Sequence, residues 1–445
     1  MGRPADAPAP GRAGLWAHRP FAETGVIMLR LLMAGVLAVD PHVVDWIDKN
    51  AQQQVTREAI GAATVVGLGE SSHGTHEEAT IKFGVLRFLV EEMGFRSIAW
   101  EEDWTTSVRV NRYVLTGEGD LDALMGELTT TWRNREVRDV LAWLRAYNAG
   151  HDDKVRFVGV EYYATRSLAH DAVSSYVTEA APQRLGELRR HLRPIRPRHE
   201  DAGANLRWYM GVTDKRPYIR HARAVYELVE GLPGNDRQRL ALHHARQILS
   251  WYEAFSLPFE DVYAYRDARA AENLRWWQRR TGDKVAYWAA SAHTAAAPGL
   301  RMVLGGEAVA FDSAGSYLRR WYGDRYRSIG VLFDHGSLST GDGCGVAPAP
   351  VPRPDPGFAN RVFGDVGRAQ YVVDLRAKAP EAVRAWLRAK APEAVRAWLR
   401  APAKVRGYSD YVPAAAQKSY MEGGSPAQWF DVIIHRQVIT PCTPL

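Results

Sequence analysis

Residues 63–104 read ATVVGLGESSHGTHEEATIKFGVLRFLVEEMGFRSIAWEEDW, and this stretch decides the fold. Residues 64–68 are an apolar, β-branched run between turn signals, which is typical of a buried strand in a parallel sheet. Over residues 75–93 apolar side chains recur at three- and four-residue steps, a pattern that predicts a helix. Residues 95–100 predict a second buried strand. The stretch is therefore expected to form a strand–helix–strand unit.

Each predicted strand of this unit ends in an acidic residue. Glu70 follows the first strand and Glu101 follows the second, and Glu161 ends a third predicted strand further along. Strands of such a unit point the same way, so these carboxylates should emerge at one edge of the sheet. Ligand crevices of open α/β sheets lie outside that carboxyl edge. The sequence therefore predicts the functional site at this edge of the sheet.

The remaining elements complete an α/β pattern, with a central, mostly parallel sheet flanked by helices. Residues 167–260 carry helical spacing without a strand signal, and we expect a helical insertion that covers the carboxyl edge of the sheet. The expected divisions are a disordered tail over 1–27, core segments over 28–166 and 261–445, and this insertion between them. Helices are expected at 41–54, 105–116, 121–128 and 136–148, strands at 154–160, 284–289, 308–311, 328–333 and 429–434, and a Gly- and Pro-rich loop at 341–356.

One internal repeat is present near the C-terminus. The twelve letters KAPEAVRAWLRA occur at residues 378–389 and again, unchanged, at 390–401. Two copies are too few for a solenoid. Each copy predicts a short helical segment that begins at a proline, with no catalytic role.

Composition narrows the class of protein. The chain has 445 residues, of which 46% are hydrophobic, enough to bury a large core. The net charge of +6 comes from scattered arginines, without a basic run interleaved with aromatics, so we expect no nucleic-acid partner. The apolar stretch at residues 26–39 contains Arg30 and is too short to span a bilayer, so no membrane partner is expected.

The cysteines and the N-terminus bear on the compartment. Cys344 and Cys442 are the only cysteines in the sequence. Their spacing leaves a single bridge open, and two unpaired thiols in a reducing cytosol are the favoured interpretation. Starting from Met28, residues 31–39 would resemble a weak signal segment that lacks a convincing cleavage site. We therefore expect a cytoplasmic protein.

His73 is the candidate catalytic residue. It lies three residues after Glu70, and a histidine there can act as a general base if Glu70 or Glu101 orients its other ring nitrogen. The alternative is a helix N-terminus with serine and threonine caps, which leaves the strand-end acids unexplained. His293 follows the predicted strand at 284–289 and joins the same edge. Two histidines and two glutamates suit either a mononuclear metal site or metal-free hydrolysis.

Several motifs resemble the erythromycin esterase family. GESSHGT at 69–75 is similar to that family's GExxHGT signature, and AWEED at 99–103 is similar to its second acidic strand end. YRDARAAEN at 265–273 and WAASAH at 288–293 resemble a later helix and the strand motif WAHNAH. GSYLRR and IGVLF, which start at residues 315 and 329, continue the resemblance. It implies hydrolysis of a macrolactone ester without a cofactor or tightly held metal.

The resemblance also implies residue roles. His73 would be the general base, Glu70 and Glu101 would orient it and the water, and His293 would polarise the carbonyl. The expected substrate-binding residues are His76, Lys82, Arg266, Glu102 and Tyr265. The chain departs from the family motif at Ala290, where a histidine is replaced, and losing such a donor typically costs about a hundredfold in rate.

These observations predict a metal-independent hydrolase that acts on a bulky, partly apolar ester or lactone. No Gly-x-Ser-x-Gly motif is present, which disfavours a serine hydrolase. The alternatives are a family member used in natural-product biosynthesis, with His73 removing a proton, a metalloenzyme, and a non-catalytic binding protein. The oligomeric state is not predicted.

Overall fold

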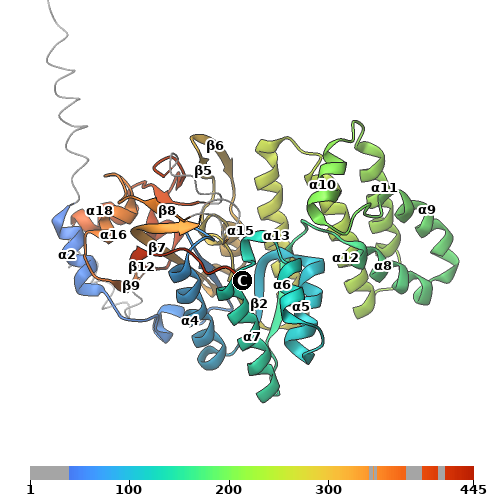
Figure 1. Ribbon diagram of the computed structural model, residues 1–445, viewed down its shortest axis with the longest axis horizontal. Coiled ribbons are helices and arrows are strands. Elements are labelled where there is room, and N and C mark those ends of the chain that lie inside the picture. Colours follow the sequence, from blue (N-terminus) through green and yellow to red (C-terminus); the bar gives the residue numbers. More distant parts are fainter. Residues whose placement is uncertain (1–39, 340–343, 345–347, 377–392, 409–415) are drawn as a thin grey trace, which may run out of the picture. The chain divides into compact units, whose positions relative to one another are not determined.

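A computed structural model describes residues 40–339, 344, 348–376, 393–408 and 416–445 (Figure 1). Its main sheet has the strand order β3-β2-β4-β1-β7-β12-β9, with β8 paired to β7. Six strands of this sheet run parallel to one another, namely β1, β2, β3, β4, β7 and β12. The other two pair antiparallel, β8 with β7 and β9 with β12. The mostly parallel α/β sheet predicted from the sequence is confirmed. The strands are β1 Val65–Gly69, β2 Phe95–Asp103, β3 Arg156–Glu161, β4 Lys284–Trp288, β7 Tyr326–Ser339, β8 Pro348–Val351, β9 Gln370–Asp374 and β12 Val432–Ile439.

The strand–helix–strand unit forms as the sequence predicts. Helix α4, His76–Met93, connects β1 to β2, and Gly94 ends it in the left-handed conformation with φ 73°. Leu86 and Leu89 of α4 are fully buried in the core beneath it. Since β1 and β2 are parallel to the intervening β4, their carboxyl ends lie at one edge.

Helices cover both faces of the sheet, which explains the continuous apolar runs in its strands. Val66 of β1 and Trp100 of β2 face the core that is shared with α4 and α7. Val65 and Ala99 face the opposite core, which α13 and α15 share. The helices on the two faces include α5 Trp104–Thr116, α6 Leu121–Glu127, α7 Arg135–Gly150, α13 Phe259–Thr281 and α15 Ala314–Tyr322.

A group of helices with its own core separates β3 from α13 in the sequence. Its first helix begins soon after the carboxyl end of β3, and α13 returns the chain to the same edge. Figure 1 shows this group in green. Its aromatic core includes Tyr209, Trp251 and Tyr252. The helices are α8 Ser167–Ala180, α9 Leu185–Ile195, α10 Ala202–Met210, α11 Arg216–Glu230 and α12 Asp236–Ala254.

A second, smaller sheet contains one of the predicted strands. The strand expected at 308–311 is β6, Glu307–Phe311, which pairs with β5, Leu300–Leu304, outside the main sheet. This sheet continues through β11, Tyr420–Glu422, to β10, Val405–Arg406. Sequence periodicity predicted β6 but not its sheet. β6 pairs only with the neighbouring β5, and β5 joins the rest of this sheet by pairing with β11, more than a hundred residues further along the chain.

In two places the predicted type of element is wrong. Residues 341–356 were expected to be loop, but β8 lies within them and pairs with β7 through Gly336–Ser339. Its prolines are tolerated because β8 is an edge strand. The last strand was expected from residue 429, whereas Pro426–Trp429 forms the short helix α19, capped by Ser425, and β12 starts at Val432.

The other elements are short. Of the duplicated segment, the second copy contains α18, Glu393–Arg400, and the first copy lies outside the described residues, as does the predicted tail over 1–27. Within the described part of the chain no helix has the length and apolarity needed to cross a membrane. The remaining elements are α2 Pro41–Asn50, α3 Arg57–Ile60, α14 Ser291–Thr294, α16 Ala359–Gly364, η1 Thr130–Trp132, η2 Pro182–Arg184 and η3 Gly323–Arg325.

The expectation of two unpaired thiols is wrong. Cys344 and Cys442, which are 98 positions apart in sequence, form a disulfide with Cα atoms 5.6 Å apart. Cys442 lies beyond β12, where its backbone N–H donates to the carbonyl of Gly74 (3.1 Å). The bridge therefore depends on where β12 delivers the C-terminal segment, which the spacing of two cysteines does not reveal.

Loss of this bridge should destabilise the fold. A disulfide that closes a long loop typically contributes about 2–4 kcal/mol by restricting the unfolded chain. We expect reductant, or Cys442→Ser, to lower the free energy of unfolding by about that amount in urea titrations. Reductant should leave the Cys442→Ser variant unchanged. Superimposable curves for oxidised and reduced wild-type protein would contradict the prediction.

Candidate active site

Polar side chains converge at the carboxyl edge of the sheet, where the sequence predicted them. Glu70 follows β1, and Glu161 ends β3. His293 lies in α14, directly after β4. Gly69 is required at this edge, because a Cβ there would lie 2.5 Å from Thr294 Oγ1 and 2.7 Å from Ser291 Oγ.

His73 is oriented by Glu70. Its Nδ1 lies 2.6 Å from Glu70 Oε1, and the other oxygen of Glu70 accepts from Lys82 Nζ (2.8 Å). Lys82 is buried on α4, lies 4.3 Å from the centre of the Trp288 ring and also donates to the carbonyl of Ala289 (3.3 Å). The side chain of His73 is 12% exposed, and its Nε2 forms no hydrogen bond within the described part of the chain. One ring nitrogen is thus held by a carboxylate while the other is left for a ligand.

Trp132 determines the position of the His73 ring from the other side. The two ring centres are 4.6 Å apart in an edge-on arrangement. The indole N–H of Trp132 donates to the backbone carbonyl of Glu101 (2.8 Å), so the ring is tied to the end of β2. The same loop is held by Glu102, which accepts from the backbone N–H of Thr129 (2.7 Å) and from its hydroxyl (3.0 Å). Burial raises the pKa of Glu102 to about 7.

Glu101 and Glu161 share the guanidinium of Arg266. Arg266 Nη2 donates to Glu101 Oε1, and its Nε donates to Glu161 Oε1 (3.1 Å). The second oxygen of Glu101 accepts from the backbone N–H of Ala290 (2.8 Å). Burial by itself would raise the pKa of Glu101, but the nearby charges of His293, Arg266 and His73 hold it well below its usual range. Glu161 is fully buried, and burial raises its pKa to about 7 in spite of Arg266.

His293 lies between Arg266 and Asp267. Its Nδ1 is 3.0 and 2.9 Å from the two oxygens of Asp267, and its Nε2 is 2.7 Å from Arg266 Nη1. An arginine can only donate, so this contact requires an unprotonated Nε2 and a proton on Nδ1. Burial and the charge of Arg266 lower the pKa of His293, and the carboxylates of Asp267 and Glu101 outweigh them and raise it. His293 therefore joins Arg266 to Asp267, accepting from the guanidinium and donating to the carboxylate.

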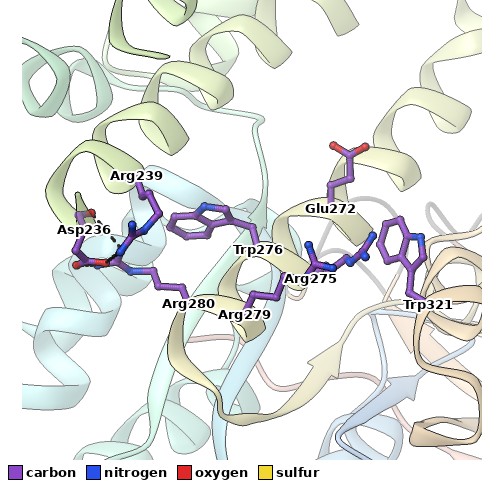
Figure 2. A pocket seen from close by; sticks show the side chains of 8 residues that line it. All are labelled: Asp236, Arg239, Glu272, Arg275, Trp276, Arg279, Arg280 and Trp321. Atoms are coloured by element: carbon purple, nitrogen blue, oxygen red, sulfur yellow. Dashed lines mark hydrogen bonds and ion pairs between the residues drawn. The ribbon is translucent and has the colours of Figure 1, made fainter. Parts of the chain in front are cut away.

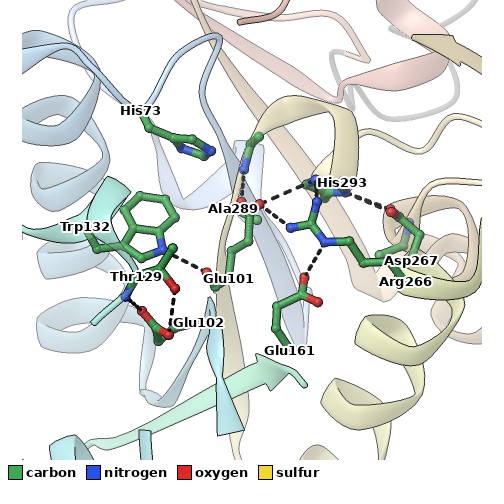
Figure 3. Close-up of polar contacts among 12 residues, drawn as sticks. His73, Glu101, Glu102, Thr129, Trp132, Glu161, Arg266, Asp267, Ala289 and His293 are labelled. Carbon is green, nitrogen blue, oxygen red and sulfur yellow. Dashed lines mark hydrogen bonds and ion pairs between the residues drawn. The ribbon is translucent and has the colours of Figure 1, made fainter. Parts of the chain in front are cut away.

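Figure 3 shows the relation of these groups. Glu101 lies in the middle, with His73 and Trp132 on one side and Arg266, His293 and Asp267 on the other. His73, with one ring nitrogen free among the described residues, thus faces Arg266 and His293 across the carboxylate of Glu101.

The hydrogen bonds of two predicted substrate-binding residues connect them to parts of the chain outside this cluster. His76 Nδ1 is 2.7 Å from Glu136 Oε1, and Glu136 also accepts from the backbone and hydroxyl of Thr443, so His76 belongs to a contact with the C-terminal segment. The Tyr265 hydroxyl donates to Glu253 of α12 (2.6 Å). Substrate contact by these two residues stays a prediction.

Sequence reasoning missed the partners that hold the cluster in place. Asp267 was passed over although it follows Arg266 directly, and its Oδ1 also accepts from the backbone N–H of Ala314 (2.7 Å). Glu78 lies in the first turn of α4, a position that by itself indicates only a favourable charge at the helix N-terminus. It is fully buried, and its two oxygens accept from the backbone of Ser71 (2.7 Å) and Ser72 (3.1 Å), the residues before His73. Periodicity would have found Glu78, since it lies one turn before Lys82.

Glu78 should make stability depend on pH. Burial raises its pKa from 4.5 to about 8, and the hydrogen bonds from Ser71 and Thr75 offset only part of this. The folded state then holds a proton that the unfolded state releases above pH 4.5, so this contribution to stability falls as pH rises toward 8. Glu78→Gln cannot titrate. We expect the melting temperature of wild type relative to Glu78→Gln to fall as pH rises from 4.5 to about 8, measured by thermal denaturation.

A matched control lies on the same helix. Glu91 pairs with Arg87 at the surface, so Glu91→Gln should change the melting temperature little at any pH in this range. Parallel pH profiles for wild type and Glu78→Gln would show that Glu78 keeps its charge in the folded protein.

The described residues do not offer a grouped set of side chains that would bind a metal ion. Among them no three or more histidine, cysteine, aspartate or glutamate side chains are grouped so as to hold an ion. The acids of the cluster instead face Lys82 and Arg266.

Together, the sheet and its edge define an α/β protein with a histidine–carboxylate site that can move a proton. The family model for erythromycin esterase matches residues 90–438. The chain therefore belongs to the erythromycin esterase family. The matched range starts within α4, after the loop that carries Glu70 and His73, so those two residues are assigned by motif and geometry.

Individual relatives are more distant. The chain is 30% identical over 122 residues to the erythromycin esterase type II of Escherichia coli, covering 26% of this chain and 29% of that protein. The chain thus spans less than a third of that curated relative in the alignment.

Solved structures match over most of the chain. A protein of Bacillus cereus superposes with a TM-score of 0.75 at 24% identity, and a succinoglycan biosynthesis protein with 0.74 at 22%; each match covers 91% of this chain and 98% of the other. A mutant of the erythromycin esterase EreC in its open conformation gives 0.63 at 16%, covering 87% and 93%. At these identities the likeness concerns the fold.

Proposed function

We propose that this protein hydrolyses an ester or lactone bond of a small molecule, with His73 as the general base. Membership in the erythromycin esterase family supports hydrolysis of an ester. The observation that carries the proposal is the arrangement of the His73 ring. Nδ1 is held by Glu70 at 2.6 Å, and Nε2 is left without a protein partner in the described residues. This is the geometry that a general base needs.

The reaction would proceed in two stages. Nε2 of His73 takes a proton from water, and the oxygen attacks the ester carbonyl to form a tetrahedral oxyanion. When the C–O bond to the alcohol breaks, the protonated His73 returns the proton to the leaving oxygen. Glu70 accepts from Nδ1–H throughout and stabilises the imidazolium that forms. Lys82 Nζ donates to the other oxygen of Glu70 (2.8 Å) and keeps that carboxylate in position.

Arg266 is the candidate for stabilising the oxyanion. Its contacts to Glu101, Glu161 and His293 use one N–H at each of its three nitrogens. Each terminal nitrogen carries a second N–H, so two donors remain for a substrate oxygen. Donors that are already fixed by the protein are worth most in transition-state stabilisation. His293 would support this role by accepting from Arg266.

A second candidate is proton removal without addition of water. Ala290 stands where the family motif has a histidine, which removes a donor from the site. One of the similar structures is a succinoglycan biosynthesis protein. In that case His73 would abstract a proton from the substrate in an elimination or cyclisation.

Isotopic labelling of the product separates the two candidates. The protein would be incubated in ¹⁸O-water with a panel of macrolides, lactones and aryl esters, and the products analysed by mass spectrometry. Hydrolysis predicts an acid that carries one ¹⁸O atom. A product without label would exclude hydrolysis for that substrate and support the second candidate.

A further inference from the structure

A second polar pocket lies along the C-terminal half of α13. It has a volume of about 560 Å³, within the range of small-molecule sites. Figure 2 shows Trp276 in its middle, with Arg239 and Arg280 on one side and Arg275 and Arg279 toward Trp321. The lining residues are Asp236, Arg239, Glu272, Arg275, Trp276, Arg279, Arg280 and Trp321.

An adjoining pocket extends the basic surface. It has a volume of about 380 Å³, shares Arg239, Glu272 and Trp276 with the first, and adds Arg246 and Arg269. The two pockets are therefore lined by arginines 239, 246, 269, 275, 279 and 280, and by the two acids Asp236 and Glu272. Six arginines and two acids give this region a clear excess of positive charge.

The two acids are already paired. Asp236 accepts from both terminal nitrogens of Arg280 at 2.6 Å and from Arg239 at 3.3 Å. Glu272 accepts from Arg269 at 2.6 Å. These carboxylates neutralise part of the charge and hold Arg239, Arg269 and Arg280 in position.

Arg275 and Arg279 form no ion pair with any described residue. Arg275 is half-buried, and its guanidinium lies 4.5 Å from the centre of the Trp321 ring. That contact fixes the side chain while leaving its hydrogen-bond donors free. Trp276 is likewise fixed, with its ring stacked on His243 at 3.8 Å. Arg275 and Arg279 thus bring donors to the pocket that no carboxylate of the described residues binds directly, although the charge of Glu272 acts on Arg275.

Helix capping explains only part of this arrangement. Arg279 and Arg280 lie in the last turn of α13, where cations are favoured by the helix dipole. Arg239 lies in the first turn of α12 and Arg246 near the middle of that helix, and both line the same region. Placing these two arginines near Arg275 and Arg279 gains no stabilisation from the α13 helix dipole and adds repulsion between like charges.

We propose that this pocket binds a small molecule with several phosphate groups. Guanidinium groups match phosphate oxygens in pairs and remain charged at every physiological pH. Four arginines line the larger pocket, so a chain of two or three phosphates could contact them together. The phosphates could belong to an inorganic polyphosphate or to a nucleoside triphosphate whose base lies near Trp276 or Trp321.

The pocket is separate from the site proposed for ester hydrolysis. Arg266 of that site is also on α13, nine residues before Arg275, which corresponds to about 13 Å along the helix. The inference therefore holds whether or not the protein is a hydrolase.

The test is calorimetric titration of the full chain with inorganic triphosphate and, separately, with ATP. The variant Arg275→Ala/Arg279→Ala removes two unpaired charges from the pocket. Its control is Arg189→Ala/Arg193→Ala, which removes two exposed arginines from α9, outside both pockets. Circular dichroism melts would show that both double variants are folded.

We expect wild type and the control to bind triphosphate alike, and the pocket variant to bind at least about tenfold more weakly, since hydrogen bonds to charged groups are lost. Equal affinities for triphosphate and ATP would assign the site to the phosphate chain, and tighter ATP binding would assign it to a nucleotide. Failure of wild type to bind either probe, or equal weakening in both variants, would overturn the proposal.

Discussion

His73→Ala is expected to lower the rate of ester hydrolysis by about a hundred- to ten-thousandfold, the contribution typical of a general base. The variant keeps Glu70, Lys82 and Arg266, so binding of the ester should change much less than turnover. We expect kcat to fall with little change in KM. The measurement is steady-state kinetics on any ester that the labelling experiment identifies as a substrate.

Two further measurements distinguish loss of the catalytic group from damage to the folded structure. Added imidazole should restore part of the activity of His73→Ala by entering the space that the ring leaves. His151→Ala is the matched control: His151 lies at the end of α7, with Nδ1 on the carbonyl of Tyr147 (2.8 Å), and it should retain full activity. Wild-type turnover in His73→Ala would refute the proposed role.

Arg266→Gln is expected to damage both activity and stability. Arg266 pairs with Glu101 and Glu161, which are 7% and 1% exposed at their side chains. Removing one partner of a buried ion pair leaves uncompensated charge and typically costs about 3–5 kcal/mol. Loss of the candidate oxyanion donor should also lower kcat by about a hundredfold or more. Urea denaturation and ester kinetics would measure the two effects.

The stability loss should depend on pH with a definite sign. The pKa of Glu101 is lowered in the folded protein, so its contribution to stability is present above the ordinary value of 4.5 and declines as pH falls below it. The difference in unfolding free energy between wild type and Arg266→Gln should therefore narrow below pH 4.5. Arg269→Gln is the control, because its partner Glu272 is about half-exposed and such pairs contribute about 0–1 kcal/mol. A difference that stays constant from neutral to acid pH would contradict the prediction.

The sequence by itself determined the strand–helix–strand unit and the edge where the site forms. Local periodicity carries that information, because strands buried on both faces read as apolar runs and α4 shows a helical repeat. The acidic ends of β1, β2 and β3 then follow from the parallel direction of the strands. The predicted positions of Glu70, His73, Glu101 and His293 at this edge agree with the structure.

Only the tertiary structure decided which groups pair. Arg266 lies 165 residues from Glu101 in sequence, and its contacts to Glu101, Glu161 and His293 depend on where α13 returns to the sheet. The Cys344–Cys442 bridge likewise depends on the path of the chain after β12. The basic pocket was invisible in the sequence, because its arginines come from α12 and α13 and never form a continuous run. Periodicity describes each element by itself, whereas pairing, charge clusters and crosslinks arise from the packing of elements that are distant in sequence.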